Sequence, residues 1–288
     1  MDSRLSSPVV LLCPVRGCRR PLAQGERRLT CPRGHSFDVA RSGYVNLLQP
    51  QDRRSPRAGD PVAVRQARGR LIERGLETPI TEALVNLLHV GRADAVLDAG
   101  CGDGHHLAAL ASRSGSEGHG LDISTAAIDE AARRYPDLHW VVANADRFLP
   151  YAAASFRAVT SITARRNPEE FRRVLRPDGV LLLVVPAPDD LIEVREAILG
   201  EGRARDRVAT AIETFAPVFT LERHERIRHV AHLDAAALAD LMTGSYRGGR
   251  ASRQARLATV GALDVTLSRD ALLFRPARRG PARDRASG

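Results

Sequence analysis

A short apolar strand that runs into a glycine-rich turn constrains the fold of this chain more than any other feature. Residues 95–100 read AVLDAG, and Gly100, Gly102 and Gly104 then alternate with other residues at the start of a helical pattern that extends to residue 115. Glycines let the backbone approach a ligand where a side chain would clash, and the start of a helix offers free N–H groups. The segment therefore predicts a ligand-binding turn at the carboxyl end of a buried strand.

Strand and helix patterns alternate along the rest of the chain. Further strands are expected at 119–124, 138–146, 155–163, 180–186, about 217–231 and about 263–274. Helices are expected within 62–88, at 102–115, at 124–134 with Ser124 as N-cap, at 167–175, within 189–214 and at 234–243, and RPDG at 176–179 is expected to be a turn. This alternation is typical of an α/β, doubly wound fold of the Rossmann-like type. No apolar run reaches the roughly 18 residues of a membrane span, so we expect a cytoplasmic protein without a membrane partner.

The spacing of the glycines distinguishes between two nucleotide-like cofactors. A dinucleotide site has the pattern G-x-G-x-x-G, whereas this turn has G-x-G-x-G followed by His105. Asp98 before the turn is unfavourable beside a pyrophosphate, but it suits the cationic methionine end of S-adenosylmethionine. Asp122 can accept both ribose hydroxyls, and Asn144 and Asp146 can meet the adenine edge. The sequence thus favours S-adenosylmethionine, and a hydride-transfer enzyme and a fold that has lost its cofactor stay alternatives.

Three cysteines and a histidine near the N-terminus have the spacing of a metal site, C-x4-C-x12-C-x3-H. Cys13 and Cys18 share one turn with proline and glycine, CPVRGC, and Cys31 and His35 share another, CPRGH. Tetrahedral zinc takes four such ligands, and a filled set makes the site structural, because a catalytic zinc keeps one position open. A disulfide fits a reducing compartment poorly, and unrelated buried cysteines are the remaining alternative. The four residues are therefore the predicted zinc ligands.

The chain is basic at both ends and mildly acidic between them. All 43 basic side chains are arginines, and the net charge is +6 over residues 1–60, −4 over 61–241 and +7 over 242–288. We interpret the flanks as a surface that holds a polyanion, with the arginines of 53–57 and 247–256 as candidate contacts; arginines that only face solvent are the alternative. The expected organisation is a zinc knuckle at 1–48, an arginine-rich linker at 49–61, a cofactor-binding domain at 62–275 and a disordered basic tail at 276–288.

Together these features resemble the 23S ribosomal RNA guanine-N1 methyltransferases, a family that includes the tylosin-resistance enzymes. The most specific part of the resemblance is the run from CPVRGC through CPRGHSFDVARSGYVNLL to RRSPRAGD and VRQAR, followed by VLDAGCGDG. The resemblance implies a small N-terminal zinc-binding domain that helps to recognise an rRNA hairpin, joined to a class I S-adenosylmethionine-dependent methyltransferase domain. It implies methyl transfer to N1 of a guanine in the large-subunit rRNA, with Gly102 and Asp103 in the cofactor turn. A homodimer is a further expectation.

Two positions that the resemblance places beside the cofactor depart from the family pattern. Glu77, in GLETP, stands where the family has an aromatic residue, and Asp190, in PAPDDL, stands where it has a histidine; TARRN, with Arg165, lacks a proline. Asp190 is the candidate general base for the guanine N1 proton, and a helix N-cap is its alternative role. The departures keep two hypotheses open: a methyltransferase for another RNA or a small natural product, and a non-catalytic zinc-dependent RNA-binding protein. The predicted cofactor contacts are Glu77, Asp98, Gly100, Gly102, Asp103, Gly104, Asp122, Asn144 and Asp190.

Overall fold

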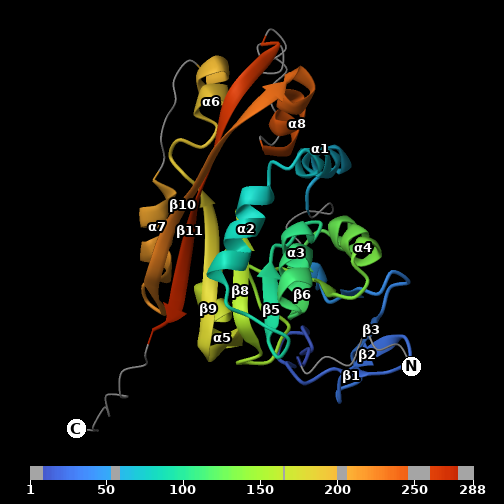
Figure 1. Ribbon diagram of the computed structural model, residues 1–288. Helices are drawn as coiled ribbons and strands as arrows, with labels where there is room; N and C mark the ends of the chain where they lie inside the picture. The colour runs from blue at the N-terminus through green and yellow to red at the C-terminus, as the bar shows by residue number, and fades with distance from the viewer. Residues whose placement is uncertain (1–8, 53–58, 165, 200–205, 246–259, 278–288) are drawn as a thin grey trace, which may run out of the picture.

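The computed structural model describes residues 9–52, 59–164, 166–199, 206–245 and 260–277. Its centre is an eight-stranded sheet with the order β10-β11-β9-β8-β5-β6-β7-β4 (Figure 1). The strands are β4 (Val45–Asn46), β5 (Ala95–Ala99), β6 (Glu117–Asp122), β7 (His139–Val142), β8 (Phe156–Ile162), β9 (Leu175–Pro186), β10 (Phe219–Asp234) and β11 (Ala262–Pro276). Strands β4 to β9 pair in parallel, whereas β11 is antiparallel to both of its neighbours, β9 and β10. The prediction of an α/β fold is confirmed.

Strand β5, which precedes the glycine-rich turn, lies where the order of the sheet reverses. The chain continues from β5 to β6 and β7 on one side and returns to β8 and β9 on the other. Ligands of open α/β sheets bind at this point, beyond the carboxyl ends of the strands. Strand β5 is buried along its whole length, which explains the apolar character of its sequence.

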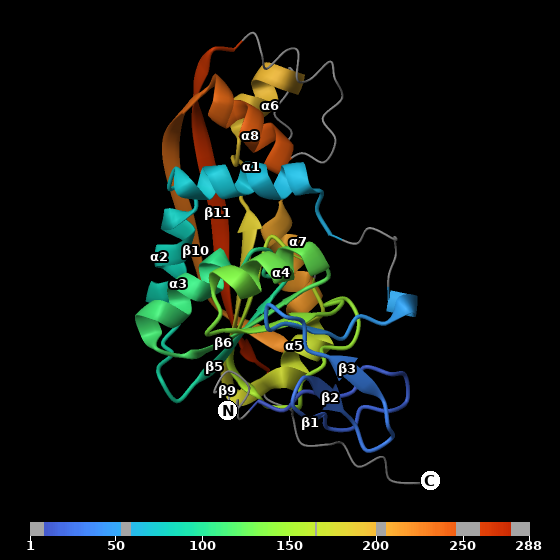
Figure 2. The same ribbon diagram turned by 90° about the vertical axis from the view of Figure 1, so that its right-hand side faces the viewer.

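Helices cover both faces of the sheet, as the two views in Figures 1 and 2 show. One face carries α2 (Thr78–Leu87), α3 (His105–Ser114) and α4 (Thr125–Arg134), and the other carries α5 (Pro168–Val174) and α7 (Arg207–Phe215). Leu84 and Leu107 are buried on the first face, and Phe171 and Phe215 on the second. Ser124 caps α4 as predicted, because its side chain accepts a hydrogen bond from the backbone N–H at the third helical position.

Residues 176–179 differ from the predicted turn. Strand β9 begins at Leu175, which pairs with Phe156, and its pairing resumes at Val180 opposite Ala158. The four residues RPDG of β9 therefore stand opposite the single residue between Phe156 and Ala158, as an irregular bulge in the strand.

Residues 9–48, here called the zinc module, contain a small antiparallel sheet. Its strands are β1 (Ala23–Gln24), β2 (Arg28–Thr30) and β3 (Ser36–Asp38), and a 3-10 helix, η2 (Pro50–Asp52), follows the module. Strand β4, at the end of the module, extends the large sheet beside β7, and Leu11 near its start pairs with Tyr151 in an isolated bridge. Leu29 and Leu47 share a buried cluster with side chains of the central strands. The zinc module thus packs directly on the large sheet.

A further group of helices packs at one end of the long β10–β11 hairpin, where β10 ends and β11 begins. Helices α1 (Val62–Glu73), α6 (Ile192–Leu199) and α8 (Ala235–Ser245) gather around this end of the hairpin (Figure 2). Leu71, Val194, Leu238 and Val265 belong to a buried cluster of their own there. Helices packed at this end stand beyond the carboxyl ends of β8 and β9 in Figure 1, on the side of the cofactor turn.

Several sequence predictions fall outside the described residues. These are the candidate RNA contacts among the arginines of 53–57 and 247–256, Arg165, and residues 278–288 of the predicted tail. Among the helices that are described, none is both long and apolar enough to cross a membrane.

Candidate functional site

The glycine-rich turn between β5 and α3 is held to the next strand by backbone hydrogen bonds. Gly100 N donates to Leu121 O over 2.7 Å. Both carboxylate oxygens of Asp122 accept from backbone N–H groups, one from Gly102 at 3.1 Å and one from Ser124 at 2.8 Å. Asp122 therefore joins the turn after β5 to the start of α4, where its carboxylate lies at the carboxyl end of β6.

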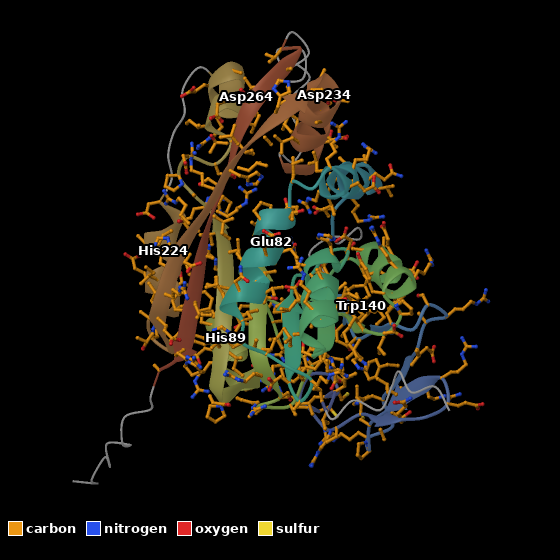
Figure 3. All side chains as sticks on the ribbon, viewed as in Figure 1. Glu82, His89, Trp140, His224, Asp234 and Asp264 are labelled. Carbon is orange, nitrogen blue, oxygen red and sulfur yellow. The ribbon has the colours of Figure 1, made fainter. Side chains whose placement is uncertain are left out.

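Two glycines of the turn are required by close packing as well as by backbone conformation. Gly104 has φ +78°, and a Cβ at this position would lie 2.2 Å from the Trp140 ring. Trp140 belongs to the buried cluster that α3 and α4 form on the sheet, and Figure 3 shows it on that side of the molecule. Gly100 has φ +90°, and its Cβ would lie 2.4 Å from the Cβ of Ala164, just after β8. At Gly100 and Gly104 the turn thus leaves no room for a side chain.

Three carboxylates around the turn lie within electrostatic range of one another. Asp98 is buried and accepts a hydrogen bond from the Thr160 hydroxyl at 2.8 Å. Burial raises the pKa of Asp98 to about 6, and the charges of Asp122 and Asp103 act in the same direction. Burial also raises the pKa of Asp122. A cationic ligand would relieve this repulsion, so the site has the charge that the methionine end of S-adenosylmethionine requires and a pyrophosphate does not.

Glu77, just before α2, faces the first turn of α3. Its carboxylate lies 3.5 Å from His106 Nε2, and the other ring nitrogen of His106 lies 3.0 Å from the Thr81 hydroxyl. Burial by itself would raise the pKa of Glu77, but the hydrogen bond and charge of His106, with the charge of Arg269, outweigh it and lower the pKa. Glu77 is therefore a charged group beside the first turn of α3, and its contact with the cofactor stays a prediction.

Asp190 lies in the loop after β9 and is held by β11. Its carboxylate accepts a hydrogen bond from Ser268 N at 3.0 Å and forms an ion pair with Arg269. Burial raises the pKa of Asp190 although Arg269 opposes it. The charge of Arg269 also acts on Glu77, so both unusual acids of this sequence lie within electrostatic range of one guanidinium.

The third predicted strand end carries an amide in a tight turn. Asn144 is buried two residues after β7, and its side-chain oxygen accepts from Asp146 N at 2.9 Å. The side chain of Asp103 accepts from His105 N at 3.2 Å, at the start of α3. Asp98 thus lies within β5, Gly100 and Gly102 follow β5, Asp122 ends β6 and Asn144 follows β7. Glu77 precedes α2 and Asp190 follows β9, and the charge of Arg269 acts on both of them.

Sequence reasoning missed the segment that lies against this edge. Gly59 packs so closely on the start of α4 that a Cβ would lie 2.3 Å from the Ser124 Cβ. The neighbouring Asp60 pairs with Arg68 at 2.6 Å, and its charge contributes to the raised pKa of Asp122. The signal was present in the motif RRSPRAGD, whose glycine and aspartate are these two residues.

A second unpredicted group lies at the amino ends of β6 and β7. One carboxylate oxygen of Glu117 lies 2.8 Å from His119 Nε2 and 3.2 Å from His139 Nε2. The two imidazole rings stack with their centres 4.5 Å apart. Burial lowers the pKa of His119 to about 4, so this ring is neutral at neutral pH and donates its Nε2–H to Glu117.

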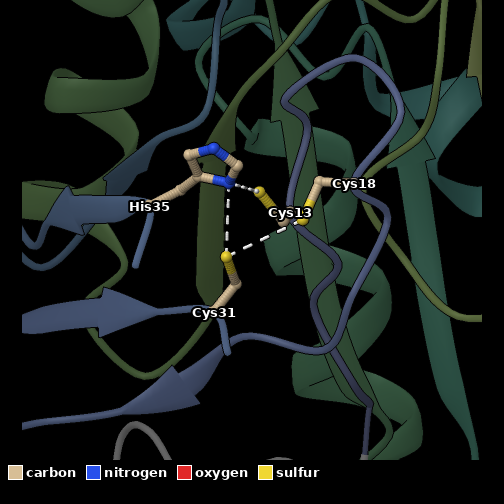
Figure 4. Close-up of side chains that lie close together, drawn as sticks. All are labelled: Cys13, Cys18, Cys31 and His35. Atoms are coloured by element: carbon tan, nitrogen blue, oxygen red, sulfur yellow. Dashed lines mark hydrogen bonds between the residues drawn. The ribbon is translucent and has the colours of Figure 1, made fainter. Parts of the chain in front are cut away.

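The four predicted zinc ligands converge in the zinc module (Figure 4). His35 Nδ1 lies 3.3 Å from the sulfurs of Cys13 and Cys31, and the sulfurs of Cys18 and Cys31 lie 3.8 Å apart. Tetrahedral zinc with ordinary bond lengths places two sulfurs about 3.8 Å apart and a sulfur and a nitrogen about 3.6 Å apart. The donor set and its spacing therefore fit a zinc ion.

The two turns that carry the ligands form as their glycines predict. Gly17 has φ +77° and Gly34 has φ +81°. The Arg33 guanidinium donates to Gly17 O at 3.2 Å and so links the two turns, while the Arg19 guanidinium lies 4.6 Å from the centre of the Phe148 ring, after β7. The zinc module thus contacts the segment between β7 and β8 beside its metal site.

Comparison with known proteins finds a matching family model for the zinc module and another for the domain that contains the glycine-rich turn. Residues 11–56 match the family model "RlmA, N-terminal", a zinc ribbon, and residues 96–179 match the model "Methyltransferase domain". A Streptomyces fradiae protein named 23S rRNA (guanine(748)-N(1))-methyltransferase is 38% identical over 92% of this chain and 96% of its own length. The chain belongs to the 23S rRNA (guanine-N1)-methyltransferase family.

Other relatives of this family member agree with the assignment. The Bacillus subtilis protein YxjB, whose name gives the same reaction provisionally, is 34% identical over 91% of this chain and 95% of its own length. The solved structure of YcgJ from Bacillus subtilis has the same fold, with a TM-score of 0.50, 18% identity, and coverage of 69% of this chain and 98% of that one. The predicted class I methyltransferase fold, S-adenosylmethionine as cofactor and the N-terminal zinc site are confirmed.

Proposed function

We propose that this enzyme transfers a methyl group from S-adenosylmethionine to N1 of a guanine in a hairpin of 23S rRNA. The observation that carries the proposal is the similarity to the Streptomyces fradiae enzyme, which extends over 92% of this chain and so includes both the zinc module and the cofactor turn. The substrate would place the enzyme in the cytoplasm. A homodimer stays a prediction.

In this proposal the cofactor lies across the carboxyl ends of β5, β6 and β7. Gly100, Gly102 and Gly104 allow close approach of the backbone, and Asp122 accepts hydrogen bonds from the ribose hydroxyls. Asn144 meets the adenine edge. The carboxylates of Asp98 and Asp103 would offset the positive charge of the methionine end, and Glu77, held by His106, would add to this negative charge.

The chemical step requires positioning and the removal of one proton. S-adenosylmethionine supplies a methyl group on a cationic sulfonium. As the N1–C bond forms and the C–S bond breaks, the guanine N1 proton must pass to a base. We assign this role to the Asp190 carboxylate, because Ser268 N and Arg269 fix its orientation. Its raised pKa makes it a stronger base than an exposed aspartate.

The zinc module is proposed to hold the RNA. Its described residues contain seven exposed arginines but only two acids, Glu26 and Asp38; the arginines are Arg16, Arg19, Arg20, Arg27, Arg28, Arg33 and Arg41. Such a surface binds phosphates with an affinity that falls as salt rises. Farther along the chain, Gly59 packs on Ser124 and the charge of Asp60 acts on Asp122, both at the proposed cofactor site.

Transfer of tritiated methyl from S-adenosylmethionine to rRNA that lacks this modification tests the proposal. We expect label in the large-subunit rRNA with wild type, and loss of label with Asp122→Ala. Asp137→Ala, an exposed aspartate just before β7, is the matched control and should behave as wild type. Cofactor binding without transfer to rRNA would favour another RNA or a small natural product, and absence of cofactor binding would favour a non-catalytic RNA-binding protein.

Asp190→Asn separates the proposed base from a structural role. The amide keeps the size of the side chain but cannot accept the proton, so kcat should fall while the affinities for cofactor and RNA stay close to those of wild type. Partial recovery of kcat at higher pH is expected, because deprotonation of guanine N1 itself then replaces the base. Unchanged kcat would remove Asp190 from the mechanism and leave the rest of the proposal intact.

A further inference from the structure

A cavity at the carboxyl ends of β8 and β9 is not used by the cofactor site described above. It has a volume of about 290 Å³ and is lined by Thr163 and Arg166 after β8, by residues 183–186 of β9 and by Arg207 at the start of α7. This volume is at the lower limit of pockets that take whole small molecules, and it suits one small group. The two arginines give the cavity its chemical character.

Arg166 and Arg207 both line the cavity, and the charge of Arg207 acts on Arg166. Among the ion pairs of the described residues, none includes either arginine. The nearest acid in the sequence, Asp206, is engaged as the cap of α7, where it accepts hydrogen bonds from Val208 and Ala209 N. Burial of Arg166 and the charge of Arg207 both lower the pKa of the Arg166 guanidinium. A bound anion would offset both effects, and guanidinium groups bind phosphate oxygens in a fixed geometry.

The backbone at the cavity is also unusual. Thr163 has φ +50°, a conformation that β-branched residues rarely adopt. Its N–H still donates to Val184 O at 2.9 Å, so the strained residue is fixed at the end of the β8–β9 pair. Strain of this kind concentrates at ligand sites. The next residue, Ala164, packs on Gly100 of the cofactor turn, so the cavity adjoins the place where the methyl group would be transferred.

We propose that Arg166 and Arg207 form a phosphate-binding subsite that holds the RNA backbone beside the target guanine. This inference rests on the proposed function, and it names the RNA phosphate backbone as the part of the substrate that the two arginines bind. The carboxylate of S-adenosylmethionine is the alternative anion that the two arginines could bind. The acids Asp98, Asp103 and Asp122 lie around the cofactor turn, whereas the two arginines lie after β8 and at the start of α7. This separation of the arginines from the cofactor turn favours an RNA phosphate as their ligand.

The test compares RNA binding by wild type and by the double variant Arg166→Gln/Arg207→Gln. The probe is a labelled rRNA hairpin that contains the target guanine, titrated at several salt concentrations. We expect the double variant to bind about tenfold more weakly at physiological salt, with a salt dependence reduced by about one phosphate contact. Arg113→Gln is the control, because Arg113 is exposed at the end of α3 and its loss lowers the positive charge of the protein without touching the cavity.

A second set of hairpins, each with one neutral methylphosphonate, identifies the phosphate. One of these hairpins should bind more weakly to wild type and to Arg113→Gln, yet bind the double variant as well as the unmodified hairpin does. Wild-type methylation of the hairpin together with wild-type RNA affinity in the double variant would overturn this inference alone. Reduced affinity for S-adenosylmethionine with unchanged RNA affinity would also overturn it, in favour of the cofactor carboxylate. A wild-type protein that neither binds nor methylates the hairpin would overturn the proposed function, and this inference with it.

Discussion

Binding of S-adenosylmethionine should weaken as pH falls, because Asp98 is buried among other carboxylates. Burial raises the pKa of Asp98 to about 6 in the free protein. The cationic methionine end favours the ionised carboxylate, so the bound state has a lower pKa and binding releases a proton. Affinity is therefore full above the pKa of the free protein and is lost as pH falls through it. At about pH 5 roughly one free molecule in eleven has Asp98 ionised, which predicts a dissociation constant about tenfold higher than at about pH 7.5.

Isothermal titration calorimetry at the two pH values measures this effect directly. Asp98→Asn cannot titrate, so its affinity should vary much less with pH; the remaining variation would come from Asp122, whose pKa burial also raises. Asp137→Asn removes an exposed carboxylate and should keep the pH dependence of wild type. If wild type binds equally well at both pH values while circular dichroism shows it folded, or if Asp98→Asn has the same pH dependence as wild type, the electrostatic reasoning is refuted.

Three further predictions concern the zinc site, the turn and the core. Wild type should contain one zinc ion per chain by metal analysis, and Cys31→Ser should contain none; a folded, metal-free wild type would contradict the site. Gly104→Ala should lower cofactor affinity more than tenfold in calorimetry, because its Cβ would lie 2.2 Å from Trp140, and adding Trp140→Leu should restore part of it; wild-type affinity in the single variant would contradict the packing argument. Between about pH 7.5 and 5, protonation of His119 should lower the free energy of unfolding, measured in urea, by about 2 kcal/mol. In the unfolded chain this imidazole binds a proton near its ordinary pKa, whereas in the folded protein its pKa is about 4, so acid stabilises the unfolded chain. His119→Gln should lose this part of the pH dependence, and equal slopes in both proteins would disprove the assignment.

The features that sequence alone predicted are those that depend on neighbours in the chain. The turn that carries Cys31 and His35, the Ser124 cap and the glycine-rich turn each follow from a few consecutive residues. The fold was predictable because strands and helices that alternate along the chain allow only a few topologies. The zinc site also requires two turns that are separated in the chain to approach each other. This approach was predictable because one tetrahedral zinc ion takes its four ligands from both turns.

The features that sequence did not predict depend on contacts between distant segments. Asp190 and Arg269 are 79 residues apart, and only the antiparallel pairing of β11 with β9 brings them together. Gly59 is far from Ser124 in the chain, and its close packing there could not be read from local pattern. Arg166 and Arg207 looked like ordinary surface charges among 43 arginines until the ends of β8 and α7 placed them at one cavity.

The identity of the modified atom tests the central claim most directly. Large-subunit rRNA without this modification would be incubated with the enzyme and S-adenosylmethionine, digested to nucleosides and analysed by mass spectrometry, with reverse transcription to locate the position. We predict one new N1-methylguanosine per RNA, at a single guanine in a hairpin, where the methyl group blocks Watson–Crick pairing and stops the transcriptase. A methyl group on another atom or another base, or no methylation of the RNA by a protein that binds both zinc and the cofactor, would contradict the account.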